Sequence, residues 1–284
     1  MNYNDTLLDS AKKTGNITCM GLDPKLEVLP EGMELVEFFE LLFEKMIEKK
    51  LIPSAFKPNI GYYQSLDKPR EGNFTGSKAL AKVLDLLEKY FPGIPVILDS
   101  KRGDIARSSL NYEIEAFDCW KTDAVTVSPY MGTDSVSPFQ VEGKGIYVLN
   151  RTSNPGGKDL QNLICDDEKP LYLNVSAKIV EWSEGNKGLG AVVGATSMKE
   201  LSDISQYYSD KEIPMLIPGV GSQGGSATDV IEVLNKTGYP LYLARINSSS
   251  GLTHPWKKGS APENWIDMCT SSIAKLLEET KVQF

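Results

Sequence analysis

The chain alternates short, nearly continuous apolar runs with longer segments, and this alternation limits the folds open to it. Parallel strands covered on both faces need such runs, because neither face meets water. Most gaps between the runs are long enough for a crossover helix. Eight runs are expected to form strands: residues 17–23, 54–59, 95–101, 124–129, 146–153, 191–196, 215–220 and 241–247. Eight alternating units predict an α/β fold, a closed (β/α)8 barrel, although periodicity alone leaves a doubly wound open sheet as the alternative.

Three segments between or after these runs carry an apolar face at helical spacing: residues 35–50, 78–90 and 265–281. A length of 284 residues is ordinary for one barrel, and no low-complexity linker interrupts the chain. We therefore expect a single barrel domain over residues 1–284. Two Pro- and Gly-rich stretches, 68–76 and 154–158, are expected to be long loops at strand ends that act as lids.

Composition and charge exclude several classes of function. The formal net charge of −8 argues against a nucleic-acid or anionic-membrane partner, although an acidic protein can hold a small cationic pocket. A polar opening and the lack of a long apolar stretch predict a cytoplasmic protein. Four cysteines without CxxC spacing suggest neither a zinc site nor disulfides. The single histidine, His254, excludes a multi-histidine metal site and is expected to be a bystander.

Charged residues gather where the first three predicted strands end. Asp23 ends the first strand, Lys57 and Asn59 end the second, and Asp99 and Lys101 end the third. The carboxyl ends of barrel strands form the face where active sites are built. The alternative is a salt-bridge network that braces the barrel, but ions at strand ends cost several kcal/mol each unless paired, which favours a functional array.

The chemistry of this array suggests a decarboxylation. Carboxylate neighbours favour a protonated lysine, so Lys101 is a candidate proton donor. An anionic Asp99 beside a substrate carboxylate would favour loss of that carboxylate. The run PGVGSQGG at 218–225 has the glycines of a phosphate-binding loop after a strand, with a plain turn as the alternative, and Ser226 is placed to cap the next helix.

Several motifs together resemble those of the orotidine 5′-phosphate decarboxylase family, in its longer bacterial branch. They are GLDP at 21–24, FKPN at 56–59, LDSKRGDI at 98–105 and PGVGSQGG at 218–225. The resemblance implies a cofactor-free enzyme of pyrimidine biosynthesis that converts orotidine monophosphate to uridine monophosphate. It also implies that Lys57, Asp99, Lys101 and Asp104 form the catalytic network, with Lys101 as the proton donor to the carbon left by carbon dioxide.

Further roles follow from the same resemblance. It implies a homodimer with shared active sites, in which Asp104, Ile105 and Ser108 enter the site of the partner subunit. The remaining candidate substrate contacts are Asp23 and Asn59 at the ribose or the charged network, Thr152 and Ser153 near the pyrimidine, and Pro218 and Gln223 at the lid and phosphate. For Thr152 and Ser153 a plain polar turn is an equal alternative.

One position departs from the family pattern. Ser249 and Ser250 are also candidate substrate contacts, and Ser250 stands where the family usually has an arginine that binds the phosphate. Arg245, Lys257 and Lys258 are the candidates to replace it. No metal-ligand cluster and no dinucleotide-binding GxGxxG after the first strand are evident, so no cofactor is expected. Two rivals remain: a magnesium-dependent phosphosugar decarboxylase or synthase on the same barrel, and a non-catalytic nucleotide-binding barrel.

Overall fold

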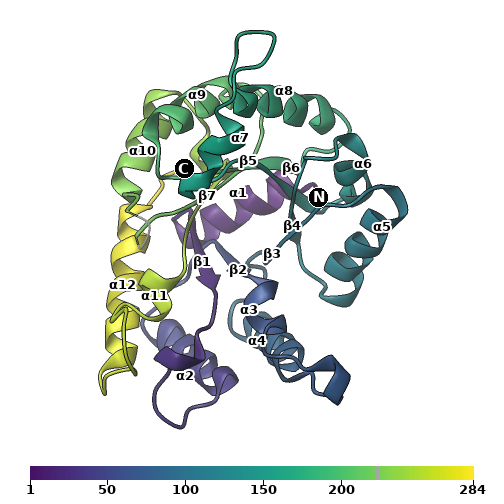
Figure 1. Cartoon of the computed structure of the whole chain (residues 1–284). Helices are drawn as coiled ribbons and strands as arrows, with labels where there is room; N and C mark the ends of the chain where they lie inside the picture. The colour runs from purple at the N-terminus through teal and green to yellow at the C-terminus, as the bar shows by residue number, and fades with distance from the viewer. Residues whose placement is uncertain (222–223) are drawn as a thin grey trace.

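The computed structural model describes residues 1–221 and 224–284, and its strands form one parallel sheet that closes on itself (Figure 1). The strands are β1 (Thr18–Leu22), β2 (Ala55–Pro58), β3 (Ile97–Arg102), β4 (Ala124–Val127), β5 (Gly145–Arg151), β6 (Leu189–Val193), β7 (Met215–Pro218) and β8 (Ala244–Ser248). The order is β2-β1-β8-β7-β6-β5-β4-β3. Parallel bridges Phe56–Val96 and Asn59–Asp99 join β2 to β3 and close the (β/α)8 barrel, so the doubly wound alternative is excluded.

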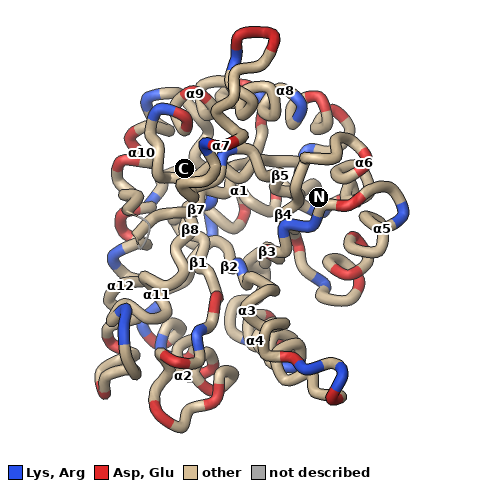
Figure 2. The backbone as a smooth tube through the Cα atoms, in the orientation of Figure 1, with Lys and Arg blue, Asp and Glu red and all other residues tan. Residues whose placement is uncertain are grey.

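Helices surround the strands. The helices are α1 (Tyr3–Thr14), α2 (Leu35–Glu48), α3 (Ile60–Gln64), α4 (Thr75–Tyr90), α5 (Ala106–Ile114), α6 (Thr133–Val136), α7 (Lys158–Gln161), α8 (Leu171–Ser183), α9 (Met198–Tyr208), α10 (Ala227–Lys236), α11 (Ser250–Thr253) and α12 (Trp265–Glu279). Acidic and basic positions are interspersed along the outer helices (Figure 2). Within residues 1–221 and 224–284, no helix is long and apolar enough to cross a membrane.

The predicted strands and helices are confirmed, with small shifts at their ends. The last strand begins three residues later than expected, because residues 241–243 form a 3₁₀ turn after Pro240, in which Leu243 N donates to Pro240 O at 3.0 Å. The predicted loop 68–76 is partly helical, since it contains a 3₁₀ turn and the start of α4. The predicted loop 154–158 contains the 3₁₀ turn Pro155–Gly157 and leads into α7.

The opening helix α1 was not predicted, because its polar residues hide a narrow apolar stripe. Tyr3, Leu7 and Ala11 recur every fourth residue and are all buried. Asn2 and Asp5 form a capping box at its start, and Gly15 ends it with a φ of 70°. In Figure 1 α1 lies behind the strands. Its contacts with Tyr147 and Arg245 place it against the amino-terminal end of the barrel, opposite the strand ends that carry the charged residues.

The main core lies between the barrel and its helices. Aromatic rings of α2 link the helical layer to the strands: Phe43 packs edge-on against Phe56 of β2 at 5.9 Å, and Phe38 stacks on Trp265 of α12 at 4.6 Å. Each fully buried side chain of this size stabilises the fold by about 1.5–3 kcal/mol. This packing holds β2 against α2, and α2 against α12.

Candidate active site

Charged side chains from three neighbouring strands meet at one end of the barrel. Asp99 lies at their centre: its Oδ2 accepts a hydrogen bond from Lys57 Nζ at 2.8 Å, and its Oδ1 accepts one from Lys101 Nζ at 2.6 Å. Lys57 Nζ also lies 3.9 Å from Asp23 Oδ1. The sequence predicted carboxylates and ammonium groups together at these strand ends, and the four side chains form a continuous ion-paired cluster.

Burial and pairing fix the charges of this cluster. The side chains of Lys57 and Asp99 are only 4% and 8% exposed. Burial alone would raise the pKa of Asp99, but the charges of Lys57 and Lys101 outweigh it and hold that pKa well below its usual range. Burial likewise opposes the charge of Lys57, yet Asp23 and Asp99 raise its pKa above the ordinary value. Both groups remain ionised at neutral pH, and their mutual pairing offsets the cost of removing them from water.

Thr126 on β4 holds the two charged residues of β3 in place. Its hydroxyl donates to Asp99 Oδ1 at 2.9 Å and accepts from the backbone N–H of Lys101 at 2.9 Å. Lys101 has a φ of 47°, and the pairing of β3 with β4 shifts register between Leu98 and Arg102. A non-glycine residue in this left-handed region costs on the order of 1–3 kcal/mol, so the surrounding contacts must impose it. The sequence analysis missed Thr126; its only signal was a hydroxyl within an apolar strand.

A cavity of about 620 Å³ opens over the charged cluster. It brings together ten of the predicted site residues: Asp23, Lys57, Asn59, Asp99, Lys101, Thr152, Ser153, Pro218, Ser249 and Ser250. The rest of its wall includes Lys25, Tyr62, Leu149, Val192, Leu216 and His254. The cavity is therefore mixed in character, with charged groups from β1 to β3 and apolar side chains from β5 to β7.

The close approach of two loops shapes one side of this cavity. A Cβ atom on Gly21 would lie 1.8 Å from Ser249 Oγ, so only glycine in the GLDP motif lets the loop after β8 pack against β1. The backbone of Asn59 also donates to Asp23 Oδ1 at 3.2 Å, which ties β2 to β1 at the rim. These contacts set the positions of Asp23 and Ser249 in the wall.

After β7, Gly219 and Val220 lie in the cavity wall. Gly219 and Gly221 have φ values of 101° and 88°, and Gly221 N donates to Gly225 O at 2.9 Å. Ser226 caps α10 as predicted, since its Oγ accepts from Asp229 N at 3.2 Å. Gln223 lies outside the described residues.

Three predicted site residues do not line the cavity of their own chain. Asp104 and Ile105 lie in the turn between β3 and α5, where Ile105 is 53% exposed, and Ser108 lies in the first turn of α5. The Asp104 carboxylate accepts a hydrogen bond from Ile105 N at 2.7 Å. Their role in a partner subunit stays a prediction.

The predicted role of Arg245 at the phosphate is wrong. Its guanidinium donates to the carbonyls of Tyr242, Ala244 and Leu7 at 3.0, 2.8 and 2.7 Å, and the side chain is completely buried. Arg245 is the second residue of β8, so it lies toward the amino-terminal end of the barrel, whereas Ser250 follows the carboxyl end. Arg245 therefore does not replace the expected phosphate-binding arginine. Lys257 and Lys258 are exposed and do not line the described cavity.

His254, which was expected to be a bystander, lies in the cavity wall. It is only 5% exposed, its Nδ1 lies 3.0 Å from Thr253 Oγ1, and its Nε2 has no hydrogen-bond partner within residues 1–221 and 224–284. Burial, aided by the positive charge of Lys25, lowers its pKa below the ordinary value. No pattern in the sequence distinguished this histidine; only its closeness to Ser250 along the chain hinted at the site.

Comparison with known proteins agrees with this geometry. A sequence model described as "Orotidine 5'-phosphate decarboxylase / HUMPS family" matches residues 45–238, which is more than half of the chain. The chain belongs to this family. A relative from Cupriavidus metallidurans, named orotidine 5′-phosphate decarboxylase, is 41% identical over 228 residues, which cover 79% of this chain and 80% of the relative. A relative of the same name from Halorubrum lacusprofundi is 36% identical over 271 residues, covering 93% and 92%.

Two solved structures also match the fold of this chain. Leishmania donovani OMP decarboxylase superposes with a TM-score of 0.76 at 29% identity, covering 99% of both chains. Leishmania donovani UMP synthase gives a TM-score of 0.78 at 31% identity, covering 97% of this chain and 56% of that chain. This chain thus spans little more than half of that longer protein.

Proposed function

We propose that this chain decarboxylates orotidine 5′-monophosphate to uridine 5′-monophosphate, a step of pyrimidine biosynthesis, without a metal or organic cofactor. The observation that carries the proposal is the paired array of Lys57, Asp99 and Lys101 in the wall of the cavity. Membership of the family and the names of its relatives support the choice of substrate.

The array supports a direct mechanism. The substrate carboxylate lies beside the ionised carboxylate of Asp99, and their repulsion favours departure of carbon dioxide. As the carbon–carbon bond breaks, its electron pair stays on C6 of the pyrimidine, where the Lys101 ammonium stabilises the developing charge. Lys101 then donates a proton to C6. Its side chain is 48% exposed, so it regains a proton from solvent after the product leaves.

The other residues have supporting roles in this proposal. Asp23 and Asn59 contact the ribose, Thr152 and Ser153 contact the pyrimidine, and the phosphate lies toward the β7 and β8 loops. The candidates at that end are Pro218, Gln223, Ser249 and Ser250. Their common place in the cavity wall supports these roles for all except Gln223.

We also propose that residues 1–284 act as one domain in a cytoplasmic homodimer with shared active sites. Asp104, Ile105 and Ser108 would complete the site of the partner subunit. The exposed side chain of Ile105 supports this arrangement. All four cysteines are free thiols, which suits a reducing compartment.

Two rival functions are less well supported. A magnesium-dependent phosphosugar enzyme would need free carboxylate oxygens near β2 and β3, but both oxygens of Asp99 are engaged by lysines. A non-catalytic barrel does not account for a lysine side chain that is 4% exposed beside two carboxylates. Buried ions of this kind are expensive unless they have a function.

An assay of orotidine monophosphate, followed by the absorbance change on conversion to uridine monophosphate, tests the proposal. We expect activity that is unchanged by a chelator, and a loss of 10²-fold or more, roughly, for Lys101→Ala, because that variant lacks the proton donor. The variant should keep its circular dichroism spectrum, since the Lys101 side chain packs in no core. Activity that vanishes with chelator and returns with magnesium would favour the phosphosugar enzyme, and an inactive wild-type protein would favour the non-catalytic barrel.

A further inference from the structure

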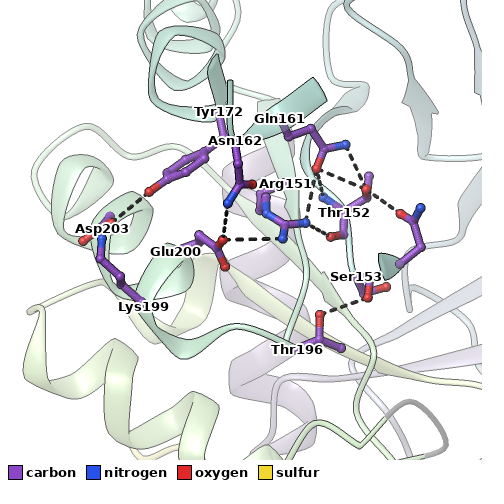
Figure 3. A network of polar contacts seen from close by, with 11 residues as sticks. Arg151, Thr152, Ser153, Gln161, Asn162, Tyr172, Thr196, Lys199, Glu200 and Asp203 are labelled. Atoms are coloured by element: carbon purple, nitrogen blue, oxygen red, sulfur yellow. Dashed lines mark hydrogen bonds and ion pairs between the residues drawn. The ribbon is translucent and has the colours of Figure 1, made fainter. Parts of the chain in front are cut away.

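A buried polar network lies behind the part of the cavity wall formed by Thr152 and Ser153 (Figure 3). Its central residues are Arg151 at the end of β5, Gln161 at the end of α7 and Glu200 in α9. Arg151 and Glu200 are only 4% and 8% exposed. None of the three lines the cavity as described, so the network does not itself meet a ligand there.

Gln161 binds Thr152 through both ends of its side-chain amide. Its Oε1 accepts the backbone N–H of Thr152 at 2.9 Å, and its Nε2 donates to Thr152 Oγ1 at 2.9 Å. Arg151 Nη1 donates to the same Oε1 at 3.3 Å and to the carbonyl of Thr152. The N–H, carbonyl and hydroxyl of Thr152 are therefore all held from behind the cavity.

Glu200 fixes the guanidinium that takes part in this clamp. Arg151 Nη2 lies 3.4 Å from Glu200 Oε1, and Asn162 Nδ2 donates to the same oxygen at 3.1 Å. Asn162 directly follows α7, so the pair joins the strand β5, the short helix α7 and the helix α9. A buried ion pair contributes little to stability compared with apolar packing, but it defines a single geometry.

Ser153 is held from its other side. Thr196 Oγ1 donates to the Ser153 carbonyl at 3.0 Å. A Cβ atom on Gly194 would lie 2.7 Å from Ser153 Cα, so the backbone of β6 approaches it closely. Thr152 and Ser153 are thus both fixed by groups that do not line the cavity.

We propose that Arg151, Gln161 and Glu200 are positioning residues for pyrimidine recognition: they hold Thr152 and Ser153 where these meet the base, so that the placement of α7 sets the affinity for the nucleotide. This inference rests on the proposed function. It assigns a binding role to α7 and α9, two helices whose residues lie outside the cavity.

A pair of neighbouring glycines offers a matched test. A Cβ atom on Gly157 would lie 2.7 Å from Arg151 Nη1, 2.9 Å from Gln161 Oε1 and 3.0 Å from Thr152 Oγ1. A Cβ atom on Gly156 would meet only Asn154 Nδ2 at 3.4 Å and Asp159 Oδ2 at 3.7 Å. Neither glycine has a positive φ, so alanine fits both backbones. Gly157→Ala therefore disturbs the network, and Gly156→Ala is its control.

We expect Gly157→Ala to raise KM and the dissociation constant of uridine monophosphate about tenfold, the order of a lost hydrogen bond, while kcat changes little. Gly156→Ala should match the wild type in all three quantities. Gln161→Ala should reproduce the binding defect without adding a methyl group to the loop. If Gly157→Ala does not fold, Gln161→Ala by itself tests the inference. Binding of uridine monophosphate is measured by calorimetry, so it reports on the network independently of turnover.

A double-mutant cycle separates positioning from a general structural role. If Gln161 acts through Thr152, then Gln161→Ala should weaken binding much less in a Thr152→Ala background than in the wild type. Additive losses, a fall in kcat without a change in binding, or wild-type affinity in both Gln161→Ala and Gly157→Ala would each overturn the inference. A wild-type protein that binds uridine monophosphate but does not decarboxylate would instead contradict the proposed function alone.

Discussion

His254 is the single imidazole of the chain, which makes its ionisation directly measurable. Burial and the charge of Lys25 lower its pKa, and Asp23 and Glu27 oppose them without reversing the direction. We expect the one imidazole signal in an NMR titration to have its midpoint below the ordinary value of 6.5. A midpoint at or above that value would contradict the buried, neutral state.

The same shift predicts a pH dependence of stability. Below about pH 6.5 the unfolded chain binds a proton at His254 more readily than the folded chain does. The neutral histidine therefore contributes its full stability above that pH. This stability is lost as the pH falls toward the lower pKa of the folded state. Urea unfolding of the wild type and of His254→Gln at pH 7.5 and 5.5 measures this loss in the free energy of unfolding. We expect the wild type to lose more stability than the variant over this interval, and equal losses would contradict the prediction.

Single residues also show how far the sequence could predict the site. The spacing of Asp99 and Lys101 was enough to place both at the rim of one strand. It did not reveal the left-handed backbone of Lys101 or the bond from Thr126, because both depend on how β3 pairs with β4. Likewise, His254 enters the wall through the turn of α11, and no local pattern predicts that contact.

At the scale of elements, the prediction worked where periodicity was strong. All eight strands lie within the predicted runs or within a few residues of them, because each run is nearly continuous in apolar residues. α1 was missed because only Tyr3, Leu7 and Ala11 of its buried face are apolar, and its partner, the end of the barrel, is distant in sequence. The predicted role of Arg245 was wrong because its partners are carbonyls of the distant α1 and of its own turn.

The two ends of β8 should therefore respond to mutation in different ways. Ser250→Arg adds a cation to the cavity wall where the family usually has an arginine, so we expect KM to fall about tenfold through charge-assisted bonds to the phosphate. Arg245→Met removes the donor to three carbonyls at the other end, so we expect an unchanged KM and a loss of stability of about 1–3 kcal/mol or more. Steady-state kinetics and denaturant unfolding of both variants measure these effects. A higher KM for Ser250→Arg would mean that another cation, with Lys25 the candidate in the wall, already serves the phosphate.

At the scale of the whole molecule, the question is whether one chain holds a complete active site. Lys57, Asp99 and Lys101 come together in one chain, but Asp104 of the same motif does not line that chain's cavity. Its neighbour Ile105 is largely exposed, and so are Leu110 and Ile114 on α5. A partner subunit packed on this surface would explain both the missing carboxylate and the exposed apolar side chains.

Mixing two inactive variants tests the shared site. If the sites are shared as proposed, every site of a Lys101→Ala homodimer lacks the proposed proton donor, and every site of an Asp104→Ala homodimer lacks the partner's carboxylate. A mixed dimer holds one site without either group and one intact site, because the intact site takes Lys101 from one subunit and Asp104 from the other. After random exchange of equal amounts, half of the dimers are mixed and half of their sites are intact, so we expect about a quarter of wild-type activity. Exchange is followed by mass spectrometry of differently tagged subunits, and mixed dimers that form without activity would show that each chain supplies its own Asp104.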